Sequence, residues 1–369
     1  MLKISTLYID SDVADLPETK AIRDKMKVPC RVVDGAGHIH DILSNAPDPE
    51  GLAKTVLYLT RNRGAFVRDC PGTSHYTCCG YRILHIGTFC TMDCAYCILQ
   101  SYFHPPVLQY FVNHGDLFAA LDRLFGENTV TRIGTGEFTD SLIWDDILPF
   151  SERLIRRFAE QKRAVLELKT KTVNIGHLLP IRHQRKTILA WSLNTETIIS
   201  GEERRTTKLQ ARLVAASQAQ AKGYPLAFHF DPIIIYPGCE TDYLFVIDRL
   251  FQSVDPSNVV WISLGTLRFM PALKTVIEQR FPRSAIACGE FVKGLDGKMR
   301  YFKPLRIAMY RRMIDRIRSH APDVLIYFCM EDDEVWRKSM GFIPSDRGGL
   351  PRMLDQSAIK CCDLAADDI

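Results

Sequence analysis

The sequence lacks several features that would assign the protein to a particular class. No apolar run approaches the roughly 20 residues that a transmembrane helix needs. The first twenty residues, MLKISTLYIDSDVADLPETK, contain no apolar core of a signal peptide. Internal repeats and low-complexity tracts are absent as well. We therefore expect a cytoplasmic protein with no membrane partner.

The sequence also lacks a strong excess of charge of either sign. Its 47 Lys and Arg residues against 43 Asp and Glu residues give a formal net charge of +4. Proteins that bind nucleic acids mainly through electrostatics usually concentrate far more positive charge. This weak basicity permits a nucleic-acid partner but does not predict one. The length of 369 residues suits one large domain with extensions, or two domains.

Cysteine, in contrast, is plentiful. Twelve cysteines in a reducing compartment indicate metal or redox chemistry more than disulfides. Cys30, Cys288 and Cys329 lie in apolar, strand-like runs, and we interpret them as buried small hydrophobic residues.

From about residue 81 onward, short apolar runs alternate with amphipathic stretches. This pattern predicts a parallel sheet covered by helices, either an open doubly wound sheet or a partial (β/α) barrel. The predicted strands are 81–87, 129–136, 164–171, 187–194, 225–236 and 259–269. The predicted helices are 116–127, 146–162, 207–223, 242–253 and 271–281. In either architecture, function lies at the carboxyl ends of the strands.

Flanking segments suggest three regions. Residues 1–80 are predicted to form a small N-terminal α/β extension, in which the stretch 47–64 turns helical. Residues 81–288 form the core. Residues 289–369 form a C-terminal extension with a hairpin turning at Asp296-Gly297, then a helix and a last strand.

Three cysteines lie close together in FCTMDCAYCIL (89–99), with the spacing C-x3-C-x2-C. A closed zinc site needs four ligands, usually in two pairs, and no second C-x2-C exists. The adjacent Cys78 and Cys79 cannot both easily point at one ion. A [4Fe-4S] cluster normally takes four thiolates, so three leave one iron open. The predicted metal ligands are Cys90, Cys94 and Cys97.

This spacing, on a loop directly after the first core strand, resembles the radical S-adenosylmethionine (SAM) superfamily. In that superfamily the open iron binds the amino and carboxylate groups of SAM. GTGE (134–137), at the end of the second strand, resembles the motif whose backbone holds the SAM amino group, although alone it reads equally as a tight turn. Glycines suit such close backbone approach. Gly134, Gly136 and Glu137 are therefore candidate cofactor-binding residues.

A closer resemblance covers most of the chain. It is similar to the spore photoproduct lyase family in 70–103, GTGEFTDSL (134–142), LELKTKT (166–172), 192–216, 222–238 and YFCMEDDEVW (327–336). The resemblance implies a partial (β/α)6 barrel of the TIM type and radical SAM lyase activity. Its implied cofactors are a [4Fe-4S] cluster and SAM, with a flavodoxin- or ferredoxin-type electron donor. Strict lyases cleave a thymine dimer in DNA after a 5′-deoxyadenosyl radical abstracts a hydrogen from C6.

The resemblance also implies site roles. Lys171 and Ser192 match positions that hold the SAM carboxylate and ribose, and a lysine suits a carboxylate. The remaining candidates for cofactor binding lie near predicted strand ends: Thr139, Asp140, Asn194 and Asp231. An alternative for Asp231 is a turn or helix-cap aspartate before Pro232.

Two departures mark a divergent member. The lyases have a hydrogen-donor cysteine where this chain has Glu137, and a relay tyrosine where it has Ile98. Glu137 and Tyr96 remain candidate catalytic residues, with Glu137 serving SAM binding or acid–base chemistry. Cys239 is a candidate substitute thiol because it follows the fifth strand. Cys79 is expected at the opposite end of the barrel unless its loop folds over, and Cys361 and Cys362 lie near a flexible C-terminus.

The predicted hairpin is a candidate nucleic-acid surface. In the lyases, a hairpin at this place wedges into lesion DNA. Basic side chains suit phosphates and aromatic ones suit unstacked bases. The candidates here are Lys293, Lys298, Arg300, Tyr301 and Lys303. The alternative is a solvated hairpin with its aromatics turned to the core, and runs such as ERRTTK (203–208) are interpreted as solvated helix faces.

Three functions stay open. The first is a radical SAM lyase that repairs a DNA lesion. The second is a radical SAM enzyme of the same family with a non-DNA substrate. The third is a non-catalytic metal-binding protein.

Overall fold

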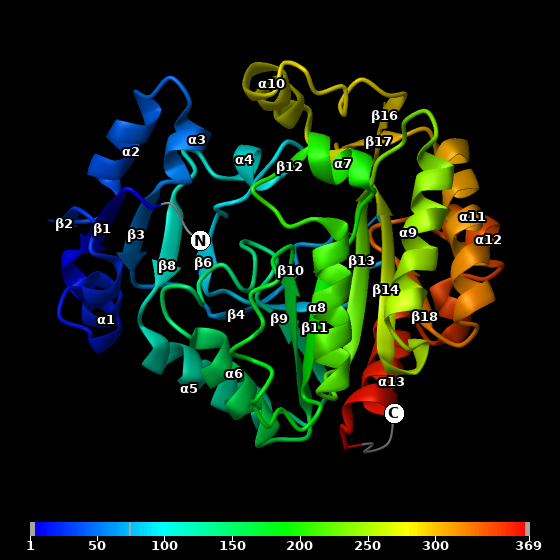
Figure 1. The fold of residues 1–369 in the computed structure, drawn as a ribbon, viewed down its shortest axis with the longest axis horizontal. Helices are drawn as coiled ribbons and strands as arrows, with labels where there is room; N and C mark the ends of the chain where they lie inside the picture. The colour runs from blue at the N-terminus through cyan, green and yellow to red at the C-terminus, as the bar shows by residue number, and fades with distance from the viewer. Residues whose placement is uncertain (1–3, 74, 366–369) are drawn as a thin grey trace.

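The computed structural model describes residues 4–73 and 75–365, and two sheets organise this part of the chain (Figure 1). The first sheet has the strand order β2-β1-β3-β8-β6, all parallel except β6 against β8. Its strands are β1 (Thr6–Asp10), β2 (Cys30–Val33), β3 (Val56–Thr60), β6 (Gly87–Thr88) and β8 (Leu108–Phe111). Helices α1 (Pro17–Met26), α2 (Gly37–Ser44) and α3 (Pro49–Ala53) belong to this unit.

One prediction in this unit is wrong. The stretch 47–64 is not a continuous helix, because α3 ends at Ala53 and β3 follows at Val56. All five residues of β3, VLYLT, are buried between neighbouring strands. β-branched and aromatic side chains favour such a central strand. Cys30 on the edge strand β2 is exposed, as is Cys288, so neither is a buried hydrophobic residue.

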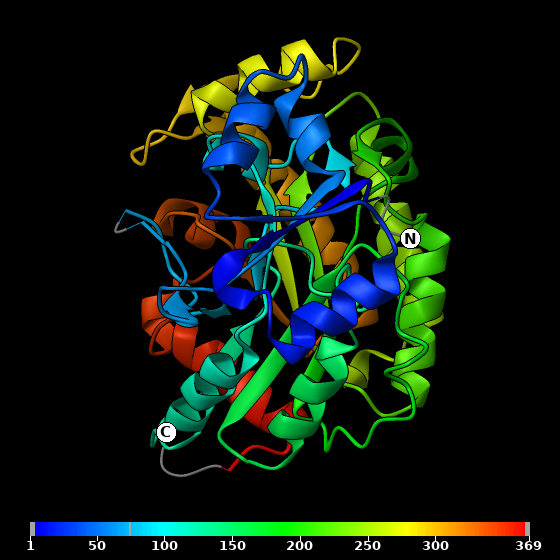
Figure 2. The same ribbon diagram turned by 90° about the vertical axis from the view of Figure 1, so that its left-hand side faces the viewer.

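The second sheet has eight strands in the order β18-β14-β13-β11-β10-β9-β5-β4 and curls into a partial barrel (Figures 1 and 2). Neighbours are parallel except β4 against β5. Its strands are β4 (Val67–Asp69), β5 (Arg82–Leu84), β9 (Thr131–Gly134), β10 (Ala164–Thr170), β11 (Thr187–Ser192), β13 (Leu226–Ile233), β14 (Val259–Thr266) and β18 (Leu325–Phe328). The six predicted core strands are confirmed, and every residue of β11 and β14 is buried, as expected for strands covered on both faces.

Helices follow these strands and cover the sheet (Figure 1). They are α4 (Leu99–Tyr102), α5 (His114–Phe125), α6 (Phe150–Ala159), α7 (Glu196–Gly201), α8 (Leu209–Ala221), α9 (Cys239–Ser253), α10 (Pro271–Arg280), α11 (Lys303–His320), α12 (Asp333–Met340) and α13 (Leu350–Cys362). Cys362 is buried within α13, so its thiol does not lie on a flexible segment. Within the described ranges, no helix is both long and apolar enough to cross a membrane.

Each sheet contains strands from both sides of residue 81, and the barrel sheet also contains a strand after residue 289. β4 precedes residue 81 and β18 follows residue 289, yet both join the barrel sheet as its two edges. β6 and β8, in contrast, lie after residue 81 but pair in the first sheet. The predicted hairpin forms from β16 (Phe291–Lys293) and β17 (Met299–Tyr301), with β15 (Arg268–Phe269) as a third strand.

Candidate functional site

The cysteine loop lies between β6 and α4 and is fixed by side chains from both sheets. Cys94, on the short strand β7 (Asp93–Cys94), pairs with Glu203 on β12 (Glu203–Arg204). The buried Lys54 ammonium donates to the carbonyl oxygens of Cys90 at 3.1 Å and Met92 at 2.6 Å. These bonds hold the loop in one shape, with Cys90 and Cys94 buried and Cys97 half-buried.

The three thiols of this loop lie near one another. Burial raises the pKa of the Cys94 thiol, and the charges of Cys97 and Cys90 act in the same direction. The Lys171 ammonium opposes this increase. Within the described residues, no three His, Cys, Asp or Glu side chains surround a single metal-ion position. A [4Fe-4S] cluster, in which each thiolate binds a different iron, fits this loop better than a mononuclear zinc ion does.

Beneath the loop lies a buried ionic network that the sequence interpretation missed. The Tyr96 hydroxyl donates to the Glu203 carboxylate, and Arg212 Nη2 donates to Glu203 Oε2 at 2.6 Å. The Glu203 and Arg212 side chains are both 0% exposed. Although burial alone would raise the pKa of Glu203, Lys171 and Arg212 lower it. Glu203 is therefore not on a solvated helix face, and Tyr96 is held by a protein carboxylate.

The two glycines of GTGE are required by close packing. A Cβ at Gly134 would overlap the Tyr81 hydroxyl and lie 2.5 Å from the Glu167 carbonyl oxygen. A Cβ at Gly136 would lie 3.0 Å from the Cβ of Lys169. These close contacts come from Tyr81 and β10, and the expected approach of this backbone to a cofactor stays a prediction.

Asp140 ties this turn to the end of β10. Its carboxylate accepts hydrogen bonds from the backbone N–H groups of Leu142 at 3.0 Å and Lys171 at 2.8 Å, and from the Thr170 hydroxyl at 2.8 Å. Thr139 beside it is buried. The Lys171 ammonium lies 5.8 Å from the Tyr96 ring centroid, on the side of the cysteine loop. Asp140 thus fixes the backbone of Lys171, whose ammonium lies on the side of the cysteine loop.

The candidates on β11 differ in their surroundings. Ser192 ends the strand, next to Lys171 in register, and its carbonyl oxygen accepts from Arg212 Nη1 at 2.8 Å. Asn194 is buried, with its amide donating to the Pro232 carbonyl at 3.0 Å and accepting from the Tyr243 hydroxyl at 2.6 Å. These protein partners indicate a structural role for Asn194, whereas Ser192 stays a candidate.

Charged side chains at alternating positions of the central strands lie inside the barrel, and we call them the charged set. Glu167 pairs with His229 at 2.6 Å, and Arg268 donates to both oxygens of Asp231 at 3.1 and 3.2 Å. Burial alone would lower the pKa of Lys169, but the carboxylates of Glu137 and Glu167 raise it. Asp231 therefore faces the interior as an ion-pair partner of Arg268 and is not simply a turn residue.

The structure does not bring Cys239 to this interior set. Its thiol is buried at the start of α9, and the charges that act on this thiol are those of Glu240 and Asp242. Cys70 and Cys329, in contrast, lie close enough to Glu137 for its charge to act on both thiols. Cys329 is half-buried, so its interpretation as a buried hydrophobic residue is wrong.

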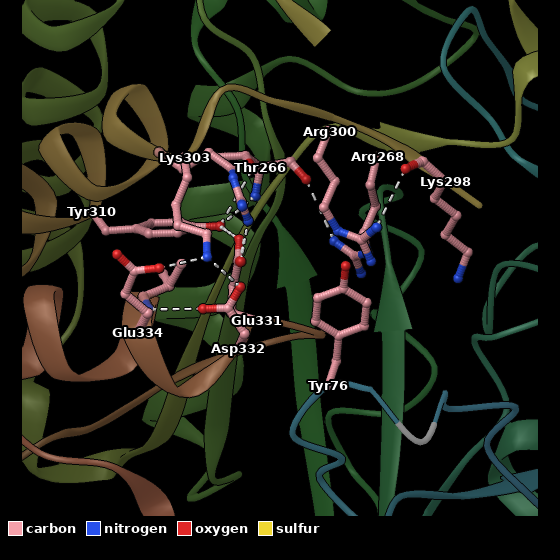
Figure 3. Close-up of polar contacts among 12 residues, drawn as sticks. Tyr76, Thr266, Arg268, Lys298, Arg300, Lys303, Tyr310, Glu331, Asp332 and Glu334 are labelled. Carbon is pink, nitrogen blue, oxygen red and sulfur yellow. Dashed lines mark hydrogen bonds and ion pairs between the residues drawn. The ribbon is translucent and has the colours of Figure 1, made fainter. Parts of the chain in front are cut away.

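The loop after β4 folds across the barrel opening. Cys79 was expected at the opposite end of the barrel unless this loop folded over. The Thr77 N–H donates to the Glu331 carbonyl oxygen at 3.1 Å, next to the end of β18. The Tyr76 hydroxyl accepts from the Leu295 N–H at 3.2 Å, and Figure 3 shows its ring beneath Arg300. This loop therefore connects the two edges of the barrel sheet and the hairpin.

Most basic side chains of the hairpin have carboxylate partners, and Figure 3 shows those of Lys303. Arg300 donates to both oxygens of Asp296 at 2.6 and 2.8 Å, and Lys303 lies 2.9 Å from Asp332 and 2.7 Å from Glu334. Lys298 lies 3.7 Å from Asp296, and Tyr301 is buried in the core. Lys293 is exposed. The exposed side chains in and next to the hairpin are mainly apolar. Leu295 is 74% exposed, Phe302 48% and Val292 45%.

Comparisons with known proteins agree on one family. The family model described as spore photoproduct lyase matches residues 71–306. Spore photoproduct lyase of Bacillus subtilis (strain 168) is 27% identical over 239 residues, covering 63% of this chain and 68% of the relative. The protein of the same name from Geobacillus sp. (strain Y412MC61) is 29% identical over 211 residues, covering 56% and 62%.

Solved structures agree with the fold. A spore photoproduct lyase mutant with bound AdoMet and dinucleoside spore photoproduct has a TM-score of 0.78 at 24% identity, covering 88% of this chain and 99% of that one. Spore photoproduct lyase complexed with dinucleoside spore photoproduct has a TM-score of 0.77 at 22% identity, covering 89% and 99%. At these identities the likeness shows the fold alone, a partial barrel.

Proposed function

Because this chain belongs to the spore photoproduct lyase family, we propose that it is a radical SAM lyase that repairs the spore photoproduct lesion in DNA. The observation that carries this proposal is the cysteine loop, fixed by Lys54 and β12 and facing the Lys171 ammonium. The relatives' bound AdoMet and dinucleoside lesion support the same ligands for this chain.

The chain's own residues would divide the work as follows. Cys90, Cys94 and Cys97 would bind the cluster, and Lys171 would neutralise the carboxylate of SAM. Ser192 would contact the ribose. When bound, the reduced cluster and SAM supply a 5′-deoxyadenosyl radical, and the protein's part is to hold and orient the reactants. Glu137 and Lys169 lie at the same end of the barrel and would face the substrate.

Anaerobically reconstituted protein with labelled SAM and dinucleoside spore photoproduct tests this function. We expect reductant-dependent formation of 5′-deoxyadenosine together with two repaired thymidine units, measured by liquid chromatography and mass spectrometry. If neither 5′-deoxyadenosine nor repaired thymidine forms, the protein would be a non-catalytic metal-binding protein. If 5′-deoxyadenosine forms but the lesion persists, the enzyme acts on a different substrate.

The hairpin would engage the duplex around the lesion through its apolar tip. Leu295 and Val292 are exposed beside Lys293, whereas three of the basic side chains pair with carboxylates of this chain. Apolar side chains inserted at a base step can kink and open a duplex, least expensively at a damaged step. We therefore assign lesion-duplex contact to the tip and not to the paired charges.

Replacing Leu295 with aspartate is expected to weaken binding to lesion-containing duplex DNA. Losing the burial of one leucine costs about 1.5–3 kcal/mol, which is roughly a 10- to 100-fold increase in Kd. Fluorescence anisotropy measures this change. Turnover of the dinucleoside, which lacks a surrounding duplex, should not change. Val214→Asp, at another exposed apolar position on α8, is the control and should bind duplex normally. Equal binding by both variants would contradict the assignment.

A further inference from the structure

A thiol lies at the carboxyl end of the last barrel strand, where the sequence interpretation placed no function. Cys329 follows β18 directly, and its N–H donates to the Leu264 carbonyl oxygen of β14 at 3.2 Å. In strand register, Tyr327 lies beside Ser263, so Cys329 comes level with Gly265 and shares the inner face with the charged set. The sulfur therefore points into the same interior as Lys169 and Asp231.

Arg268 fixes this sulfur in place. Its Nη2 donates to Cys329 Sγ at 3.2 Å, while the same guanidinium binds both oxygens of Asp231. A Cβ on Gly265 would lie 2.9 Å from the Asp231 carboxyl carbon and 3.0 Å from Arg268 Nη1, so the pair is packed against the β14 backbone. Because Asp231 fixes the guanidinium, its hydrogen bond to the sulfur orients the Cys329 thiol more strictly than a solvated side chain could.

The thiol also retains its hydrogen at neutral pH. Burial, partly opposed by Arg268, raises the pKa of Cys329 to about 11. The charges of Asp231 and Glu137 contribute to this increase, and that of Lys169 opposes it. A protonated thiol is a good hydrogen-atom donor because its S–H bond is weak, whereas the O–H bond of a carboxylic acid such as Glu137 is too strong for this task.

We propose that Cys329 donates the hydrogen atom that quenches the carbon-centred product radical, an assignment that rests on the proposed function. In this step the S–H bond breaks homolytically, a C–H bond forms on the product, and a thiyl radical remains on Cys329. One electron from the low-potential donor that reduces the cluster, and one proton from solvent, restore the thiol. Each turnover therefore uses one SAM and two electrons.

Cys329 suits this role better than the neighbouring thiols. Cys70 also lies near Glu137, but it extends the antiparallel edge strand β4, where its N–H donates to the Tyr81 carbonyl oxygen at 3.0 Å. The Cys79 thiol is near enough to Cys329 for their charges to interact, but it belongs to the loop before β5 and adjoins the exposed Cys78.

The test follows solvent deuterium into the product. Thiol hydrogens exchange with solvent, so reconstituted wild-type enzyme in D2O should place one deuterium in the repaired dinucleoside, measured by mass spectrometry. Cys329→Ser keeps the size of the side chain and an acceptor for Arg268 but has a strong O–H bond. We expect this variant to form 5′-deoxyadenosine at the wild-type rate while its yield of deuterated product falls at least tenfold. Cys288→Ala, which removes an exposed thiol, should behave as wild type.

The outcomes separate this assignment from the proposed function. If Cys329→Ser gives deuterated product at the wild-type yield, or also stops forming 5′-deoxyadenosine, Cys329 is not the donor. If Cys70→Ala alone removes the deuterium, the donor is Cys70. If the wild type repairs the lesion without taking up deuterium, no thiol donates, and the function stands while this assignment falls. If the wild type cleaves SAM but leaves the lesion intact, the proposed function and this assignment both fall.

Discussion

Replacing Arg212 with methionine is expected to lower the free energy of unfolding by about 3–5 kcal/mol, because it leaves the buried Glu203 carboxylate without its ion-pair partner. Both side chains are fully buried, so water cannot solvate the remaining charge. The same guanidinium donates to the Ser192 carbonyl oxygen at 2.8 Å and the Thr207 carbonyl oxygen at 3.0 Å, and these acceptors also lose their donor. Urea denaturation under anaerobic conditions measures the change.

A second variant separates charge from packing. In Arg212→Met combined with Glu203→Gln, the buried group is neutral and can still accept from the Tyr96 hydroxyl. We expect the double variant to recover more than half of the lost stability. A loss below about 1 kcal/mol for Arg212→Met would mean that water reaches Glu203, as at an exposed ion pair.

Replacing Cys94 with alanine is expected to abolish iron–sulfur absorbance and 5′-deoxyadenosine formation together. Cys94 is buried on β7 and held opposite Glu203, so a neighbouring thiol cannot easily move into its place. Alanine is small and apolar, so the protein itself should remain folded. Visible absorbance, iron content and the SAM cleavage assay measure the effect.

The control for this variant is Cys78→Ala, which removes an exposed thiol from another loop. It should retain the cluster spectrum of the wild type. A normal iron–sulfur spectrum in Cys94→Ala would overturn the assignment of the cluster ligands.

Local patterns were sufficient to predict the barrel strands and the cysteine loop. Each of these features depends on a continuous stretch: apolar runs of strand length, the C-x3-C-x2-C spacing, and glycines at the end of β9. The edge strand β18 could not be assigned to the sheet in this way, because pairing between Trp261 and Leu325 joins residues far apart in the chain. Strand patterns do not specify their partners.

The site residues that sequence interpretation missed depend on the same kind of long-range contact. Glu203 lies in a charged run that resembles a solvated helix face, and only its pairing with β7 buries it. Cys329 lies in an apolar run, and only the curl of the sheet brings it beside Glu137 and Arg268. In the basic hairpin, Arg300 and Lys298 pair with the nearby Asp296, whereas Asp332 and Glu334 arrive from a distant segment to pair with Lys303.

The contact of Lys54 with the cysteine loop limits how the protein can be shortened. Lys54 directly follows α3 in the unit built on the first sheet, and the Lys54 side chain is 1% exposed. Its hydrogen-bond acceptors are two carbonyl oxygens of the cysteine loop. An expression fragment that begins at the barrel would remove this support and leave those carbonyls without their donor. The smallest autonomous catalytic unit therefore includes the N-terminal sheet, and the boundary near residue 80 is not a place to divide the protein.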